Sequence, residues 1–391
     1  MNNRTRGIGT VLVLAILCIA FAQTAAQNPP PSRQQPPPPL RSPEVQQDGR
    51  VTFRMRAPNA KEVLLARDGA QRVRMHKDEQ GVWSVTTDSL PPDVYPYSFI
   101  VDGVIQPDPS NPETKSIYRI ALGQSLAHVP GPASLSWEMN DVAHGTIAHH
   151  FYKSRIIGDE RDYYVYTPPN YDPKRKEPYP VLYLLHGFTD DASAWTTAGR
   201  ANIILDNLVA SGKAKPMIMV NTLGYGAPEI VSGGFGGSAL RDPVIVKKNT
   251  VNFIAALFQE VIPQVEKSYN ARKDREGRAI AGLSMGGAQS LSAGLNYPDK
   301  FAYVGGFSSA VVMLDEDFAR AFPTVDRKIN SQLRVLWVAC GTEDFLIDSN
   351  RKFKAWLKAK DISFTPIETP GAHTWIVWRR NLTEFAPLLF R

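Results

Sequence analysis

The chain has 391 residues, 43% of them apolar, and it contains 31 prolines. This apolar content is enough for buried cores and excludes disorder over most of the length, so we expect two or three domains of the usual ~150 residues. The net charge of +6 is spread along the chain without a dense basic run, so no nucleic-acid partner is expected. Only Cys18 and Cys340 are present, which excludes a disulfide framework and a thiolate zinc cluster.

Residues 1–26 have the layout of a secretory signal peptide. Two arginines precede an apolar run over 11–22, and Ala-x-Ala-like processing points follow, after Ala22 and after Ala26. The run is shorter than the ~20 residues that span a bilayer, so no permanent membrane anchor is expected. We therefore expect a secreted or periplasmic protein, with cleavage at either of the two points.

Residues 27–47 form a proline-rich segment. Its prolines stand among Gln, Ser and Arg, which leave little apolar surface to bury. This composition favours extended polyproline II structure, so the segment is expected to be a semi-rigid linker. A proline-rich ligand for a partner domain is the less favoured alternative.

Residues 48–130 show the pattern of a small β-sandwich. Strand-like runs are found at 51–55, 63–65, 82–85 and 95–101, separated by turns that contain Gly and Pro. The stretches 81–83, 95–103 and 107–112 resemble early-set immunoglobulin-like domains related to family-48 carbohydrate-binding modules. Trp83 and Tyr97 are expected in the core rather than as sugar-stacking platforms, although the resemblance leaves glycan binding open.

After a connector at 131–144, residues 145–391 alternate between strand-like and helical patterns. The expected strands are 161–166, 180–185, 216–220, 279–281, 333–339 and 363–367. The expected helices are 201–211, 250–269, 286–296, 350–360 and 375–389. Apolar strands alternating with helices predict a parallel sheet covered on both faces, which is an α/β fold.

Within this α/β region, one motif carries a nucleophile. The strand at 279–281 runs into Gly282-Leu283-Ser284-Met285-Gly286, and a helical pattern follows at once. The G-x-S-x-G sequence between a strand and a helix predicts a sharp turn that exposes Ser284 above the sheet. The alternative, a serine that only caps the helix, does not require the flanking glycines.

An acid and a base follow in the order that such a serine requires. Carboxylates Glu343 and Asp344 lie at the end of one expected strand, and His373 lies beyond the next. His373 is the only histidine after the motif, so it is expected to take the proton from Ser284. The residue pattern alone leaves the two carboxylates as alternatives.

Two backbone N–H groups are expected to stabilise the developing oxyanion. They belong to Phe188, after the strand at 180–185, and to Met285, after the serine. Gly187 is expected to contact the substrate, and His186 to orient the loop. No metal is expected at the adjacent His149 and His150, because they would point to opposite sides of a strand. No cofactor is expected, because the chemistry needs only a serine hydroxyl.

The chain resembles carbohydrate esterase family 1, the feruloyl and acetyl-xylan esterases. S-formylglutathione hydrolases, mycolyltransferases and enterochelin esterases are more distant relatives. The matching stretches are 163–169, 184–187, 204–208, 212–216, 282–287, 340–345 and 373–379. The resemblance implies an α/β-hydrolase fold with Ser284 as nucleophile, His373 as base and Asp344 as its orienting acid. It also implies the amides of Phe188 and Met285 as oxyanion donors, and Trp375 as either a substrate contact or a helix-packing residue.

Three functions are compatible with these features. The favoured one is a feruloyl or acetyl esterase acting on plant cell-wall arabinoxylan. A siderophore ester hydrolase is the first alternative, and a non-catalytic glycan-binding protein is the second. Loops at 224–236 and 312–323 are expected to form the acyl and alcohol pockets. Removal of residues 27–129 is expected to leave the hydrolysis of small esters intact and to reduce the action on insoluble xylan.

Overall fold

The computed structural model describes residues 39–119, 123–234, 236–315 and 317–391. The predicted signal peptide and most of the predicted linker lie outside these ranges. The chain divides into a unit at 1–39 and a compact unit at 40–391, and every element below belongs to the second. None of the helices in these ranges is long and apolar enough to cross a membrane.

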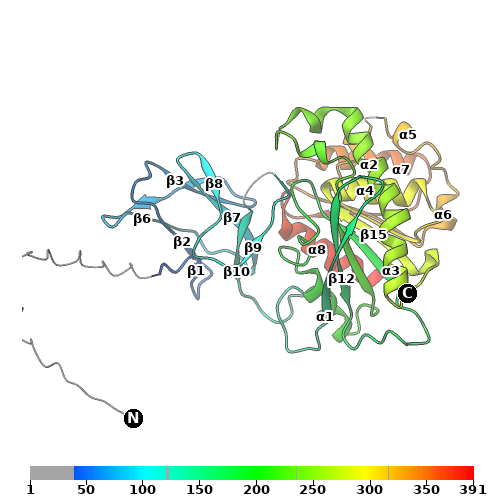
Figure 1. Ribbon diagram of the computed structural model, residues 1–391, viewed down its shortest axis with the longest axis horizontal. Helices are drawn as coiled ribbons and strands as arrows, with labels where there is room; N and C mark the ends of the chain where they lie inside the picture. The colour runs from blue at the N-terminus through cyan, green and yellow to red at the C-terminus, as the bar shows by residue number, and fades with distance from the viewer. Residues whose placement is uncertain (1–38, 120–122, 235, 316) are drawn as a thin grey trace, which may run out of the picture. The chain divides into compact units, whose positions relative to one another are not determined.

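The first part of the compact unit is an all-β sandwich of two antiparallel sheets (Figure 1). One sheet has the order β1 (Glu44–Val45), β2 (Val51–Arg56), β6 (Val82–Thr86) and β5 (His76–Lys77). The other has the order β4 (Val73–Arg74), β3 (Val63–Arg67), β7 (Asp93–Val101), β10 (Gln124–Val129) and β9 (Thr114–Lys115), with β8 (Val104–Gln106) paired to β7. Because β1 pairs with β2, the sheet begins inside the segment expected to be linker, where two residues are too few to show alternation.

The sandwich core contains the aromatic residues that sequence patterns placed there. Trp83 and Tyr97 are both buried, and Trp83 donates its indole N–H to Ala57 O at 2.9 Å. The tyrosine ring packs edge-on against Phe53 and Phe99. In the described part of the sandwich, the large apolar side chains that are exposed are aliphatic: Val73, Val104 and Ile105. Neither Trp83 nor Tyr97 therefore presents a ring face on which a sugar could stack.

The second part is an α/β domain around an eight-stranded mixed sheet. The strand order is β11 (Thr146–Lys153), β12 (Glu160–Thr167), β14 (Ile218–Thr222), β13 (Val181–Leu185), β15 (Arg278–Leu283), β16 (Tyr303–Phe307), β17 (Val335–Gly341) and β18 (Thr365–Thr369). The pairs from β14 to β18 are parallel, and β11 and β12 extend the sheet in the antiparallel sense. The prediction of a parallel sheet thus holds for the part that runs from β14 to the edge strand β18.

Helices cover both faces of this sheet (Figure 1). On one face lie α1 (Ala201–Ala210) and α8 (Trp375–Phe385), which ends in the 3-10 turn η6 (Ala386–Leu388). On the other lie α2 (Pro243–Ala256), the π-helical turn η3 (Leu257–Val261), α3 (Ile262–Ser268), α4 (Ser284–Asn296) and α7 (Ile347–Ala359). Short elements fill the connections: η1 (Pro228–Val231), η2 (Ser238–Arg241), η4 (Arg275–Gly277), η5 (Val311–Met313), α5 (Phe318–Ala321) and α6 (Ile329–Gln332).

Two local differences from the sequence-based expectation have clear physical reasons. Helix α2 begins seven residues before the expected start at 250, because Asp242 caps the N–H groups of Val244 and Ile245, and Pro243 occupies the first turn. Strand β16 was not expected, because its Gly305 and Gly306 lower strand propensity. A Cβ on Gly305 would lie 2.9 Å from the Phe385 ring, so this glycine lets α8 approach the sheet.

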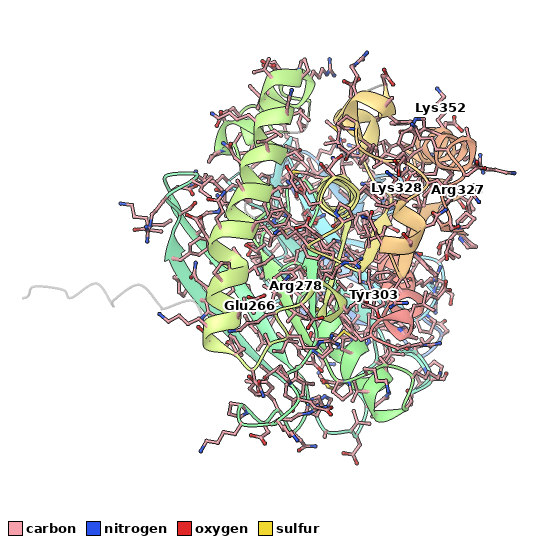
Figure 2. The ribbon with its side chains drawn as sticks, turned by 90° about the vertical axis from the view of Figure 1, so that its right-hand side faces the viewer. Glu266, Arg278, Tyr303, Arg327, Lys328 and Lys352 are labelled. Carbon is pink, nitrogen blue, oxygen red and sulfur yellow. The ribbon has the colours of Figure 1, made fainter. Side chains whose placement is uncertain are left out.

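A partly buried ion pair fixes the start of the central strand. Arg278, the first residue of β15, donates from Nε to Glu266 on α3 at 2.9 Å (Figure 2). Both side chains are mostly shielded from solvent, so salt screens this pair less than an exposed one. The contact ties α3 to the strand that leads to Ser284.

Buried charge pairs join the sandwich to the α/β domain. Arg379 of α8 is completely buried, and its guanidinium lies 2.5 Å from Asp93 at the start of β7. Lys115 of β9 forms a second buried ion pair with Asp190. The backbone N–H of Tyr118 donates to Thr189 O at 2.8 Å. The sandwich therefore contacts the α/β domain through groups that would be left buried and unpaired without it.

Candidate active site

The turn between β15 and α4 holds Ser284 in an unusual backbone conformation. Its φ is +52°, in the left-handed region that non-glycine residues rarely occupy. The turn is tight, since a Cβ on Gly282 would lie 2.6 Å from the backbone of Gly286, and one on Gly286 would lie 2.3 Å from His186 O. Both glycines are thus required for the geometry, and a strained serine at such a turn is typical of functional sites.

His373 and Asp344 are in direct contact on the loops after β18 and β17. His373 Nδ1 lies 2.8 Å from one oxygen of the Asp344 carboxylate and 3.0 Å from the other. The carboxylate is buried, whereas Glu343 is exposed. Burial by itself would raise the pKa of Asp344. The hydrogen bond and charge of His373, with hydrogen bonds from Ser308 and the Leu346 N–H, outweigh burial and hold that pKa below its ordinary value.

Two further residues that sequence reasoning missed support this acid. Trp378 donates its indole N–H to Ser308 Oγ at 3.1 Å, and Ser308 is one of the groups that hold the pKa of Asp344 below its ordinary value. The Trp378 ring also packs edge-on against the His373 imidazole, with ring centres 5.0 Å apart. Trp378 was visible in the His373–Arg379 stretch, but Ser308 follows the glycine-rich β16 and carries no sequence signal.

The loop after β13 lies against the serine. His186 is buried, with Nδ1 2.7 Å from Gly187 O, and its Nε2 accepts the Gly224 N–H at 2.8 Å. This bonding requires the neutral ring, and burial lowers the pKa of His186. A Cβ on Gly187 would lie 3.3 Å from the Ser284 Cβ and 2.5 Å from the end of the Leu283 side chain, so the loop passes close to the serine. His186 therefore orients the loop that carries Phe188.

Ser284 and His373 open onto one cavity of about 680 Å³. Gly187 and Phe188 also line it. Phe188 and Met285 flank Ser284 in a second, much smaller cavity of about 50 Å³. The structure thus brings the predicted nucleophile, base and oxyanion-loop residues together, and Asp344 lies behind His373. The roles of these residues remain predictions.

The sequence left Trp375 either as a substrate contact or as a helix-packing residue, and its place in the structure fits both roles. It is 3% exposed and packs edge-on against Trp195 and Trp378. It also lines the large cavity. From the loops expected to form acyl and alcohol pockets, Met313 reaches this cavity, and Ile230 reaches the small one. The side chains that line the cavity from the sandwich were not foreseen: Ala66, Asp68, Arg72, Ser98, Ile100, Ile105, Lys115, Ile117 and Gln124.

The two histidines considered as metal ligands lie on strand β11 and have separate partners. His149 is 2.8 Å from Asp162, and His150 is 2.6 Å from the Tyr269 hydroxyl. Adjacent side chains on a strand point to opposite faces, as expected.

Cys340 is expected to be chemically inert in the folded protein. It is fully buried in β17, and burial together with the nearby Asp344 charge raises the pKa of its thiol to about 12. The thiolate, which is the reactive form, is therefore scarce until the pH approaches that value. In a Cys18→Ser background, a maleimide at pH 8 should label Cys340 in denaturant and not in buffer. Rapid labelling of the native protein would contradict this.

Comparisons with known proteins give the same family from sequence and from structure. The family model described as "Putative esterase" matches residues 154–389. An endo-1,4-beta-xylanase/feruloyl esterase from Xylanibacter ruminicola is 30% identical over 357 residues, which are 89% of this chain and 46% of that protein. The chain thus spans about half the length of this relative. An acetyl esterase from Caldicellulosiruptor saccharolyticus is 24% identical over 52% of this chain and 80% of its own.

Solved structures extend the similarity to the fold. A CE1 ferulic acid esterase from Anaeromyces mucronatus matches with a TM-score of 0.57 at 26% identity, covering 66% of this chain and 96% of that one. An enterobactin esterase from Shigella flexneri matches with a TM-score of 0.65 at 19% identity, covering 88% of this chain and 95% of that one. The second match shows the fold only. The chain therefore belongs to the esterase family, and its α/β-hydrolase domain follows a β-sandwich in the sequence.

Proposed function

We propose that this esterase hydrolyses hydroxycinnamate esters, feruloyl esters above all, on arabinoxylan of the plant cell wall. The observation that carries the proposal is the cavity over Ser284. Its wall from the α/β domain is mainly apolar and includes Leu240, Met313 and Phe345. Such a wall suits an aromatic acyl group. The xylanase/feruloyl esterase named above matches over the sandwich as well as the α/β domain, which supports a sugar-linked substrate.

The proposed mechanism follows from the contacts of three side chains. His373 Nδ1–H donates to Asp344, which leaves Nε2 unprotonated and able to take the proton of Ser284. Ser284 Oγ then attacks the ester carbonyl, and a tetrahedral oxyanion forms. The Phe188 and Met285 amides are the proposed donors to that oxyanion.

Collapse of the tetrahedral species completes acylation. The proton on His373 passes to the leaving alkoxide, so the sugar hydroxyl departs and the feruloyl group stays on Ser284. Water then attacks the acyl-enzyme with His373 again as base, and ferulate is released. The Asp344 charge stabilises the imidazolium in both halves without itself taking the proton.

We also propose that the protein acts outside the cytoplasm. The support is the sequence of residues 1–26, with its arginines, its short apolar run and its two processing points. N-terminal sequencing of the protein recovered from culture medium or periplasm tests this. Recovery of the uncleaved chain inside cells would contradict it.

A substrate panel tests the proposed activity. Methyl ferulate, acetylated xylan and enterobactin should be compared at equal enzyme concentration, with product release followed by chromatography. We expect the highest kcat/KM on the ferulate ester, because the apolar wall contacts the ring. A higher value on enterobactin would favour the siderophore ester hydrolase. A higher value on acetylated xylan would favour acetyl esterase activity, and no turnover of any ester would favour a glycan-binding protein.

A further inference from the structure

The polar groups of the catalytic cavity are segregated by domain. Apart from Ser284 and His373, the α/β domain contributes mainly apolar side chains, with Thr189 and Asp190 at one side. The sandwich contributes the polar side chains Asp68, Arg72, Ser98, Lys115 and Gln124, beside the apolar Ala66, Ile100, Ile105 and Ile117. The α/β side thus suits an apolar group, and the sandwich side adds hydrogen-bonding groups that the α/β side mostly lacks.

Asp68 lies next to the base of the proposed triad. It follows β3, and its Oδ2 accepts the backbone N–H of Trp375 at 3.3 Å, two residues after His373. The next residue, Gly69, is packed so closely that a Cβ there would lie 3.1 Å from the Thr374 side chain. The turn after β3 is therefore held against the loop of His373. Within the described ranges, Asp68 Oδ1 has no hydrogen-bond partner, although the carboxylate lines the cavity.

Ser98 gives a second, independent sign of an unfilled polar site. It lies on β7 beside Ala66, both residues line the cavity, and Ser98 is 3% exposed. Its hydroxyl is buried and has no hydrogen-bond partner in the described structure. A buried hydroxyl without a partner costs free energy, so its presence at a cavity wall indicates a ligand that pairs with it.

The Lys115–Asp190 pair completes this side of the cavity. Both side chains are at least nine-tenths buried, and both line the cavity. An ammonium supplies donors and carboxylates supply acceptors, whereas a hydroxyl is both a donor and an acceptor. Several adjacent hydroxyls can therefore pair with Asp68, Ser98 and Lys115 together, which a simple alkyl alcohol cannot do. Burial raises the pKa of Asp68 above its ordinary value.

We infer that Asp68, Ser98 and the Lys115–Asp190 pair form the subsite for the alcohol part of the ester, and that this part is a sugar. The inference rests on the proposed function and deepens it, because it assigns the acyl group to the wall of the α/β domain and the sugar to the sandwich. The sandwich then contributes to specificity as a wall of the catalytic cavity rather than as a separate glycan anchor.

The test compares two esters of the same acid. The kcat/KM for feruloyl-arabinose is divided by that for methyl ferulate, in the wild type and in Asp68→Asn and Ser98→Ala. Asp68→Asn keeps an oxygen for the Trp375 N–H, and Ser98→Ala removes a hydroxyl that has no partner, so both variants should fold. We expect the ratio to fall about tenfold or more in Asp68→Asn, because a hydrogen bond to a charged group is lost. Ser98→Ala should lower it by a few-fold.

Asp88→Asn, an exposed aspartate of the same domain, is the matched control and should leave the ratio unchanged. Two results would overturn the sugar subsite and leave the feruloyl esterase proposal standing. One is a wild-type enzyme with no preference for the sugar ester. The other is an Asp68→Asn enzyme whose kcat/KM falls equally for both esters. A wild-type enzyme that cleaves neither ferulate ester, yet hydrolyses p-nitrophenyl acetate, would overturn both.

Discussion

Replacement of Ser284 by alanine should lower the hydrolysis of p-nitrophenyl acetate and methyl ferulate by about three orders of magnitude or more. The loss follows because water, held by the remaining groups, is a far weaker and less well placed nucleophile than the serine hydroxyl. Initial rates at saturating ester, measured against the uncatalysed reaction, give the comparison. Circular dichroism should match the wild type, since the alanine side chain is smaller and introduces no clash.

Two further variants test whether the loss of activity is specific to the Ser284 hydroxyl. Ser284→Gly should be as inactive as Ser284→Ala. Its unfolding temperature should be at least as high as that of the wild type, because glycine adopts the positive φ of this position without strain. Ser331→Ala, an exposed serine on the same domain, should keep full activity. A Ser284→Ala protein that retains its turnover would show that another group is the nucleophile.

The sequence was most informative where chemistry restricts the residue type. A G-x-S-x-G motif between a strand and a helix can adopt few backbone conformations. In this fold the catalytic residues also follow one another in the order serine, acid, histidine. The structure accordingly places His373 against Asp344 and both Ser284 and His373 on one cavity. The choice between Glu343 and Asp344 needed either a resemblance or coordinates, because neighbouring carboxylates on a loop look alike in sequence.

Contacts between distant segments were beyond sequence reasoning. Asp93 and Arg379 are 286 positions apart, and each looks like an ordinary surface charge in its own segment. Ser98 similarly belongs to a strand, and Asp68 follows one, and the alternation of these strands predicts a sandwich without indicating a neighbouring domain. From sequence, the sandwich was expected to be removable without loss of small-ester hydrolysis. Because its side chains line the catalytic cavity, we now predict the opposite result.

The buried Arg379–Asp93 pair predicts that the two domains depend on one another for stability. Arg379→Met leaves Asp93 buried without its partner, which should destabilise the fold by about 3–5 kcal/mol. The double variant Asp93→Leu/Arg379→Met removes both charges and should recover much of that loss, since an apolar pair of similar size is often tolerated. Urea unfolding of the two single variants and the double variant measures the coupling. Arg351→Met, which breaks an exposed pair with Glu368, is the control and should change little.

The contacts between the two domains also predict whether a chain without the sandwich folds and hydrolyses esters. Removal of residues 40–129 leaves Arg379 and Asp190 without their partners, and it uncovers the loop that holds His373. Such a chain should aggregate or lose even p-nitrophenyl acetate hydrolysis, contrary to the expectation from sequence. If it instead folds and cleaves that ester at the full rate, the sandwich is a separable module. The Asp93→Leu/Arg379→Met protein separates stability from activity. If it is as stable as the wild type but hydrolyses esters slowly, its low activity cannot result from unfolding, and the charge pair then also positions the loops of the active site.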